Sequence, residues 1–224
     1  FKKYLESNAT GTTIKNISLK QMREYTFELP EIGEQKRISS VLRKIDEKIK
    51  NNKAINNNLE QQAQVIFKSW FIDFKPFGGE LPRSWMKEKL GNVCNCVLGG
   101  TPSRAKPEYW NGTIPWINSG EVNNFRIIKP SETITELGLT KSATKLLPLK
   151  TTVIAITGAT LGQVSLLEID ACANQSVVGI IPNDDYPYEY IYPLIKESIN
   201  ELTCHQTGGA QQHINKQNVE SLDI

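Results

Sequence analysis

The sequence predicts an α+β fold in which a long coiled-coil-type helix is joined to a β-rich domain. The first indication is a heptad pattern of apolar residues that runs from Ile38 to Trp70 without a proline. The second is a series of short apolar runs between residues 80 and 186, separated by Gly, Pro and Asn. The third is an internal repeat that relates the first residues of the chain to the last. The chain is therefore expected to contain two different kinds of structural unit.

The long helix is predicted over residues 31–71, about 40 residues, and would be on the order of 60 Å long at ~1.5 Å per residue. Pro30 followed by acidic residues is typical of a helix start, and a Lys-Pro-Phe-Gly-Gly segment at 75–79 ends the pattern. A stripe this narrow favours pairing with a second helix, and the alternative is a helix that packs on its own domain. Two asparagines in the stripe would fix the register of such a pair. The candidate helix-pairing positions are Ile38, Leu42, Ile45, Ile49, Asn52, Asn56, Leu59, Ala63, Ile66 and Trp70.

The β-rich domain is predicted from five apolar segments with turn residues between them. A helix over residues 190–202 is expected to cover the resulting sheet. Because proline has no N–H to donate, Pro193 is expected either to kink this helix or to begin it. The predicted strands are residues 94–98, 113–117, 151–156, 163–167 and 175–181.

The internal repeat has a constant offset of 197 residues, since Ile17 aligns with Ile214 (214 − 17 = 197). Few pairs are identical, but apolar residues match apolar residues at unchanged spacing, which is typical of a duplicated unit. Because the chain starts at Phe1 and stops where the first copy continues into Glu28-Leu29-Pro30, we expect a fragment of a two-copy protein. The matched pairs are Leu5 with Leu202, Met22 with Val219, Tyr25 with Leu222 and Phe27 with Ile224.

The composition is that of an ordinary globular protein, with 39% hydrophobic and 22% charged residues. The apolar runs are too short to span a membrane, no signal peptide is evident, and four cysteines in 224 residues favour the cytoplasm. The net charge of +2 is unevenly divided, since residues 1–77 carry +5 (14 basic, 9 acidic) and residues 78–224 carry −3 (12 basic, 15 acidic). Locally basic segments could attract phosphate, although solvated loops with incidental charge explain them equally well.

Several motifs stand in the same order as in a known protein family. They are Leu90-Gly91, Gly99-Gly100-Thr101-Pro102-Ser103, Tyr109-Trp110, Ile114-Pro115-Trp116-Ile117, Ser119-Gly120-Glu121, Gly158-Ala159-Thr160-Leu161-Gly162 and Asn174-Gln175. As an ordered set they resemble the target recognition domains of type I restriction-modification specificity subunits. The segment with Leu29-Pro30 and Glu34-Gln35 is similar to the start of that family's spacer helix.

The resemblance implies a subunit with two β-rich target recognition domains, each reading one half of a bipartite DNA sequence, held apart by two antiparallel helices. Residues 1–29 would be the C-terminal tail of a preceding target recognition domain, and residues 30–77 the spacer helix and linker. Residues 78–224 would be a nearly complete target recognition domain.

The same resemblance implies the partners. They would be double-stranded DNA, methyltransferase subunits, a restriction/translocase subunit, and a second half-subunit or a second repeat of the same chain. S-adenosylmethionine, ATP and Mg would belong to the partner subunits, and no cofactor is expected in this chain.

The candidate DNA-binding residues lie in three polar segments and one amide-rich loop. Hydroxyls and lysines suit phosphate, whereas arginine, asparagine and carboxylates can also read base edges. A tight turn and a capped turn are the alternatives for the first two segments, and the aromatics Tyr109, Trp110 and Trp116 are expected mainly in the core. The candidates are Thr101, Ser103, Arg104 and Lys106; Asn118, Ser119 and Glu121; Lys141, Ser142 and Lys145; and Gln206, Gln211 and Gln212.

Motifs for catalysis or metal binding are lacking. The sequence has no Gly-x-x-x-x-Gly-Lys-Ser/Thr phosphate loop, and its two histidines form no acid-base set with the scattered carboxylates. Cys94-Asn95-Cys96 with Cys204-His205 lacks the paired spacing of a zinc site, so no metal is expected. We therefore expect a DNA specificity subunit that performs no chemistry itself. The alternatives are a coiled-coil interaction module without a DNA function, and an enzyme whose β domain binds a small substrate.

Overall fold

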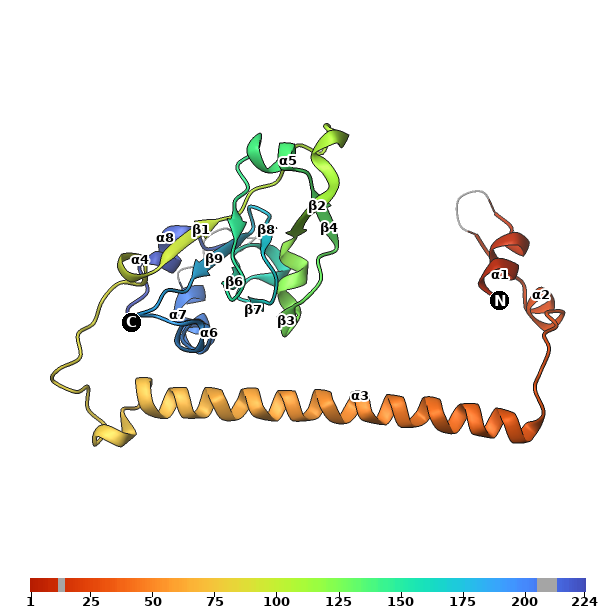
Figure 1. Ribbon diagram of the computed structural model, residues 1–224, viewed down its shortest axis with the longest axis horizontal. Helices are drawn as coiled ribbons and strands as arrows, with labels where there is room; N and C mark the ends of the chain where they lie inside the picture. The colour runs from red at the N-terminus through yellow and green to blue at the C-terminus, as the bar shows by residue number, and fades with distance from the viewer. Residues whose placement is uncertain (12–14, 205–212) are drawn as a thin grey trace. The chain divides into compact units, whose positions relative to one another are not determined.

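The computed structural model describes residues 1–11, 15–204 and 213–224. These residues fall into two compact units, Phe1–Asn58 and Leu59–Ile224, and one long helix runs from the first unit into the second (Figure 1). The predicted α+β class is confirmed, because a long helix accompanies two mixed sheets.

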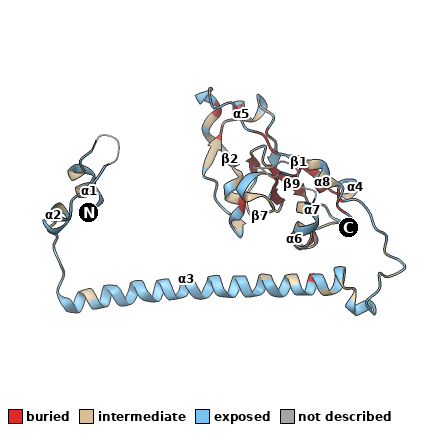
Figure 2. Cartoon of the chain, turned by 180° about the vertical axis from the view of Figure 1, so that it is seen from behind, coloured by how far each residue is buried: buried red, intermediate tan, exposed pale blue. Residues whose placement is uncertain are grey.

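The long helix, α3 (Ile32–Phe67), has 36 residues, which corresponds to roughly 54 Å at 1.5 Å per residue. Prediction and structure agree on its start within one residue. The helical path continues from α3 directly into a π-helix, η1 (Lys68–Ile72), so it ends within one residue of the predicted end at residue 71. The short 3-10 helix η2 (Lys75–Phe77) follows. Figure 2 shows α3 exposed over most of its length, with Phe67 as its buried residue.

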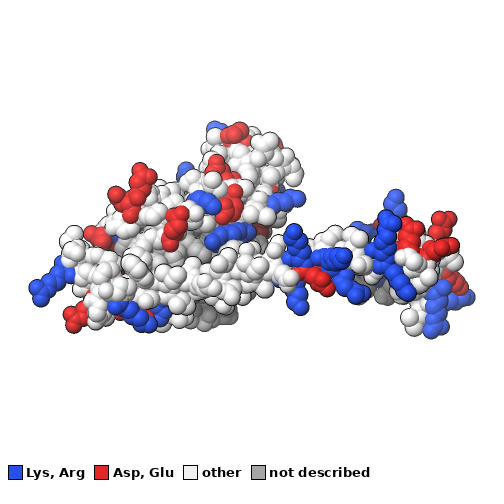
Figure 3. Space-filling model, turned by 60° about the horizontal axis from the view of Figure 1, so that its bottom comes forward, with Lys and Arg blue, Asp and Glu red and all other residues white. Residues whose placement is uncertain are grey.

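Charge is unevenly distributed along α3. Residues 36–53 carry seven Lys or Arg and two acidic residues, whereas residues 54–67 carry a single charge, Glu60. Figure 3 shows the Lys and Arg side chains gathered on the N-terminal half of the helix, and the C-terminal half largely without charge.

The second unit is built on two mixed sheets (Figure 1). Their strands are β1 (Asn95–Leu98), β2 (Trp110–Ile117), β3 (Arg126–Ile127), β4 (Glu132–Ile134), β5 (Leu146–Leu147), β6 (Thr152–Ala155), β7 (Val164–Leu167), β8 (Ala171–Ala173) and β9 (Val177–Ile181). The five-stranded sheet has the order β1-β9-β6-β7-β3, and the four-stranded sheet has the order β4-β2-β8-β5. Neighbours are mostly antiparallel, while β2 with β8 and β3 with β7 are parallel.

The five predicted strands correspond to β1, β2, β6, β7 and β9, with ends shifted by up to three residues. The sequence pattern missed β3, β4, β5 and β8. These strands are two or three residues long, which is too short for a two-residue alternation to stand out.

The five-stranded sheet is buried on both faces. Ile154 of β6 and Ile156, which directly follows the strand, belong to one apolar cluster, whereas Val153 and Ala155 of β6 belong to the other. Successive side chains of a strand point to opposite faces, so a sheet covered on both sides requires a continuous apolar run.

Helices cover one of these faces, and their apolar residues form the larger cluster with the sheet. The helices are α4 (Leu90–Val93), α6 (Tyr188–Glu197), α7 (Ile199–Cys204) and α8 (Lys216–Glu220). The single helix predicted over residues 190–202 is in fact α6 and α7, since the Ser198 N–H bonds the Leu194 carbonyl at 3.0 Å and closes α6. Pro193 lies inside α6 rather than at its start.

The last turns of α3 are attached to α6 within the second unit. The Tyr192 hydroxyl donates a 2.7 Å hydrogen bond to a Glu60 carboxylate oxygen, and the Lys196 ammonium lies 2.5 Å from the same oxygen. One turn further on, the Gln64 amide donates to the Pro193 carbonyl at 3.0 Å.

The internal repeat is visible in the secondary structure. The first unit contains α1 (Lys2–Asn8) and α2 (Leu19–Arg23). Adding the offset of 197 to their first residues gives 199 and 216, which are the first residues of α7 and α8. The duplication predicted from apolar spacing is therefore also a duplication of helix positions.

Candidate nucleic-acid interface

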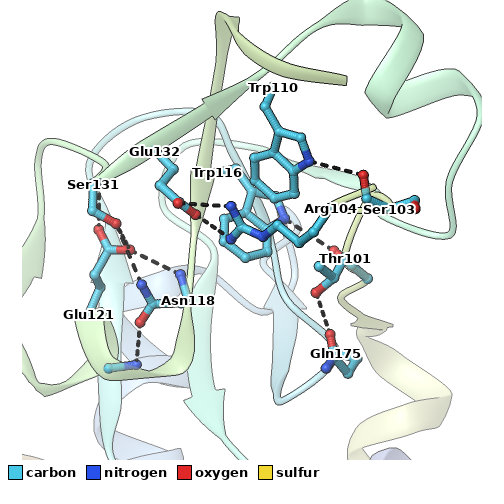
Figure 4. Close-up of polar contacts among 12 residues, drawn as sticks. Thr101, Ser103, Arg104, Trp110, Trp116, Asn118, Glu121, Ser131, Glu132 and Gln175 are labelled. Atoms are coloured by element: carbon cyan, nitrogen blue, oxygen red, sulfur yellow. Dashed lines mark hydrogen bonds and ion pairs between the residues drawn. The ribbon is translucent and has the colours of Figure 1, made fainter. Parts of the chain in front are cut away.

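The candidate interface is centred on Arg104, in the loop between β1 and the 3-10 helix η3 (Pro107–Tyr109). Its guanidinium lies 3.5 Å from the ring centroid of Trp110 (Figure 4). Both terminal nitrogens donate to the Glu132 carboxylate, at 2.9 and 2.6 Å. The Arg104 side chain remains 55% exposed, so this charged group is held in place and is still open to solvent.

The ion pair shifts the pKa of both partners in the expected directions. Hydrogen bonding to Glu132 raises the pKa of Arg104, and hydrogen bonding to Arg104 lowers the pKa of Glu132. Both groups are therefore charged at neutral pH, and the pair carries no net charge.

The β2–β4 pairing places Glu132 beside Arg104. Glu132 is the register partner of Trp116, whose ring packs edge-on against Trp110 with centroids 5.0 Å apart. The Trp110 indole N–H donates to the Ser103 carbonyl at 3.2 Å, and the Trp116 indole N–H donates to the Gly100 carbonyl at 3.1 Å. The two indoles thus connect the sheet to the loop that carries Arg104.

Of the aromatics predicted to lie in the core, Tyr109 and Trp116 are buried, whereas Trp110 is only partly buried and supports Arg104.

Gly99 and Gly100 anchor the loop. A Cβ on Gly99 would lie 2.1 Å from the Asn174 carbonyl oxygen, and a Cβ on Gly100 would lie 2.5 Å from the Thr144 nitrogen. Neither position has room for a side chain, because backbone lies directly opposite. The glycine pair therefore serves close packing of the loop against the backbone of the neighbouring segments.

The remaining predicted residues of the loop are exposed. Thr101 donates its hydroxyl hydrogen to the Gln175 amide oxygen. Lys106 donates to the Tyr109 hydroxyl at 3.0 Å, which raises the pKa of Lys106, and Ser103 contributes its carbonyl to Trp110.

The second predicted segment forms a capped turn, the 3-10 helix η4 (Ser119–Asn123). The Asn118 side chain accepts from the Gly120 N–H at 2.8 Å. Glu121 accepts from the Asn118 N–H at 3.0 Å, and from the Ser131 N–H and hydroxyl at 2.8 and 2.7 Å (Figure 4). The acceptor capacity of Glu121 is therefore directed mainly inward, and Glu121 holds the residue that precedes Glu132.

The third predicted segment follows the helix α5 (Glu136–Thr140). Lys141 and Lys145 are exposed, and the Ser142 hydroxyl accepts from the Thr144 N–H at 3.4 Å. Because the segment at Thr144 lies against Gly100, this part of the chain adjoins the Arg104 loop. The predicted residues Gln206, Gln211 and Gln212 lie outside the described residues.

Three residues of this cluster were not among the predicted site residues: Ser131, Glu132 and Gln175. Ser131 and Glu132 reach the site through the pairing of β4 with β2, and Gln175 does so through its contact with Thr101. Of these three residues, only Gln175 lies in one of the family motifs found in the sequence, Asn174-Gln175.

The predicted helix-pairing residues lie on the exposed surface of α3 and η1. Their exposed fractions range from 46% for Ile38 to 59% for Ile66 among the large apolar members. Trp70 contacts the Phe77 ring edge-on at 6.2 Å. Leu59 and Ile66 stay exposed although this end of α3 contacts α6, so the stripe and the α6 contacts use different residues.

The cysteines Cys94, Cys96 and Cys172 are buried free thiols. Burial raises the pKa of Cys94 to about 11 and that of Cys96 to about 12, so both remain protonated at neutral pH. His205 of the considered zinc motif is outside the described residues. Within residues 1–11, 15–204 and 213–224, no group of three His, Cys, Asp or Glu side chains is placed to hold a metal ion. The helices described over the same ranges are each too short or too polar to cross a membrane.

Solved structures share this arrangement of two mixed sheets and a long helix. An S subunit of a type I restriction-modification system from M. genitalium superposes with a TM-score of 0.59 at 19% identity, over 99% of this chain and 57% of that one. The HsdS subunit from Thermoanaerobacter tengcongensis gives a TM-score of 0.54 at 17% identity, over 99% and 54% of the two chains. The fold is therefore that of type I specificity subunits.

The sequence places the chain in the corresponding family. The model of the type I restriction modification DNA specificity domain matches residues 1–61 and 82–224, and the chain belongs to this family.

One curated relative is the HindI specificity subunit of Haemophilus influenzae, which is 23% identical over 88% of this chain and 57% of the relative. Another is the MjaIX specificity subunit of Methanocaldococcus jannaschii, which is 25% identical over 99% of this chain and 54% of the relative. The chain spans about half the length of these relatives.

Proposed function

We propose that this chain supplies DNA sequence recognition to a type I restriction-modification complex. Membership of the DNA specificity domain family supports this role. The Arg104 cluster indicates which surface would perform this role. In this cluster an exposed guanidinium rests on an indole beside hydroxyl and amide groups. Such groups suit base edges and phosphates.

In this proposal the β body of the second unit binds one half of a bipartite double-stranded target, and α3 sets the distance to a second reader. The exposed stripe of α3 is suited to an antiparallel partner helix with the same pattern. The second reader is then another repeat of the same chain or a second half-subunit, and residues 1–29 complete a preceding target recognition domain.

The chain performs no chemistry itself in this proposal. Methyltransferase subunits and a restriction/translocase subunit carry it out in the cytoplasm, and S-adenosylmethionine, ATP and Mg bind to those partners. A single-turnover methylation assay with the chain and S-adenosylmethionine alone is expected to give no product, and methylation in that assay would overturn the non-catalytic role.

The decisive experiment measures binding of the chain to a random-sequence duplex by fluorescence anisotropy at increasing salt. Neutralisation of phosphates by Lys and Arg predicts that log K falls linearly with log salt, by about 0.9 per phosphate contacted. Selection from a randomised duplex library is expected to enrich one short half-site. Binding that does not depend on salt, or no binding at all, would reject the DNA function and leave the coiled-coil interaction module.

A further inference from the structure

The pairing of Arg104 with Glu132 leaves one edge of the guanidinium available. Glu132 engages the two terminal nitrogens of Arg104, which form the end-on edge of the planar group. A guanidinium has five N–H donors, and the side-on edge formed by Nε and one terminal nitrogen stays unused in such a pairing. That side-on edge matches the O6 and N7 acceptors of guanine.

The charge of Glu132 distinguishes between two possible ligands of this edge. A phosphate is an anion and would meet the Glu132 carboxylate, which lies 2.6 Å from Arg104. The guanine edge presents two neutral acceptors and avoids this repulsion. An arginine without a carboxylate partner lacks this repulsion. It is therefore free to bind a backbone phosphate, the commonest contact that a DNA-binding cation makes.

The support of Arg104 restricts its movement. Trp110 lies under the guanidinium, and its own orientation is fixed by the Ser103 carbonyl and by Trp116. Glu132 is held by its place in the β4–β2 register and by the contacts of Glu121 with the preceding residue. The guanidinium therefore does not need to be ordered when a base arrives, which lowers the entropic cost of binding.

Resting on the proposed DNA function, we propose that Glu132 is a specificity-determining positioning residue that holds Arg104 for a guanine edge and keeps it from backbone phosphate. Glu132 acts through Arg104 and touches no base itself in this arrangement.

The test uses the full chain and three variants: Glu132→Gln, Arg104→Lys and the control Asp223→Asn. Asp223 is the matched control because it also pairs with a cation, Lys89, at 2.5 Å and has comparable exposure, 56% against 37% for Glu132. Each protein is titrated with a random-sequence duplex at increasing salt, and each is used to select sites from a randomised duplex library. Thermal unfolding is recorded for all four proteins.

For Glu132→Gln, affinity for the random duplex is expected to rise about fivefold at low salt, since removing one repulsive charge at about 4 Å in water changes the energy by roughly 1 kcal/mol. The salt slope is expected to steepen by about one phosphate contact. The guanine preference at one position of the selected site is expected to weaken. Asp223→Asn should change none of these.

Arg104→Lys keeps the charge and loses the fork, so it is expected to bind the random duplex as before and to lose the same guanine preference. The inference is overturned if Glu132→Gln behaves like Asp223→Asn, if Arg104→Lys loses no guanine position, or if Glu132→Gln weakens all binding together with a lower unfolding temperature. Absence of salt-dependent binding by the unmodified chain rejects the proposed function and this inference with it. If the unmodified chain binds normally and Glu132→Gln changes neither affinity nor base preference, only this inference is rejected and the proposed function stands.

Discussion

Ser18 and Asn215 cap two helices with the same reciprocal pair of hydrogen bonds, and they are 197 residues apart. Ser18 exchanges hydrogen bonds with Gln21 at the start of α2, at 2.9 and 3.2 Å. Asn215 does the same with Asn218 at the start of α8, at 2.8 and 2.9 Å. Gln21 and Asn218 are also related by the offset of the internal repeat. The two ends of the chain therefore share the same cap geometry although the capping residues differ.

The two copies differ in what covers them. In the C-terminal copy, Leu202, Val219 and Leu222 are at most 2% exposed and belong to the large apolar cluster. In the N-terminal copy, the equivalent Leu5 and Tyr25 are only partly buried and the equivalent Met22 is 44% exposed. The copies should therefore differ in their contribution to stability.

We expect Leu202→Ala to lower the free energy of unfolding by about 2–5 kcal/mol, because the substitution leaves a cavity in a closed core. Leu5→Ala, the same change at the repeat-equivalent position, is expected to cost less than about 1 kcal/mol because Leu5 is already partly exposed. Urea unfolding followed by circular dichroism measures both. Equal losses in the two variants would contradict the difference in burial.

Gly99→Ala is expected to destabilise the second unit by about 1–3 kcal/mol or more, since its Cβ would overlap the Asn174 carbonyl and the backbone would have to move. Gly33→Ala is the matched control, because nothing lies within 4 Å of a Cβ there and alanine favours a helix. Thermal unfolding of both variants provides the measurement. A Gly99→Ala protein as stable as the wild type would show that the loop is not anchored in this way.

Glu121→Ala is expected to lower the free energy of unfolding by about 1–3 kcal/mol, because the Ser131 N–H and hydroxyl lose their acceptor. The variant should also show a weaker guanine preference in the library selection, since Glu132 follows the released residue and would hold Arg104 less firmly. Denaturant unfolding and anisotropy titration measure the two effects. A variant with unchanged stability and altered base preference would instead make Glu121 a direct reader.

Glu197 is expected to contribute stability that depends on pH. Hydrogen bonds from Lys68 at 2.9 Å and Gln64 at 3.1 Å lower the pKa of Glu197 in the folded state. With the unfolded value higher, the unfolded chain binds more protons as pH falls, so this stability is present above about pH 4.3 and is lost as pH falls through the folded pKa.

The measurement for Glu197 compares wild type and Glu197→Gln in urea between neutral pH and about pH 3, which brackets the glutamate range. The stability difference between them should shrink as the solution becomes acidic. A difference that stays constant over the range would rule out the ionised Glu197 as its source.

The sequence by itself determined the long helix, five of the strands and the duplicated ends. Each of these leaves a regular signal along the chain: a heptad for α3, apolar runs for strands such as β6 and β9, and a constant offset for the repeat. The ordered motifs also determined the family. These features can be read from the sequence because each depends only on how residue types are spaced along the chain.

Only the tertiary structure decided how the candidate site is assembled. Arg104 and Glu132 are 28 residues apart, and they meet because the short strand β4 pairs with β2. The same pairing directs Glu121 inward and places Trp110 under a guanidinium. Strands of two or three residues leave no periodic signal in the sequence. The partner of a charged side chain depends on the register between distant segments, and a local sequence pattern does not contain that register.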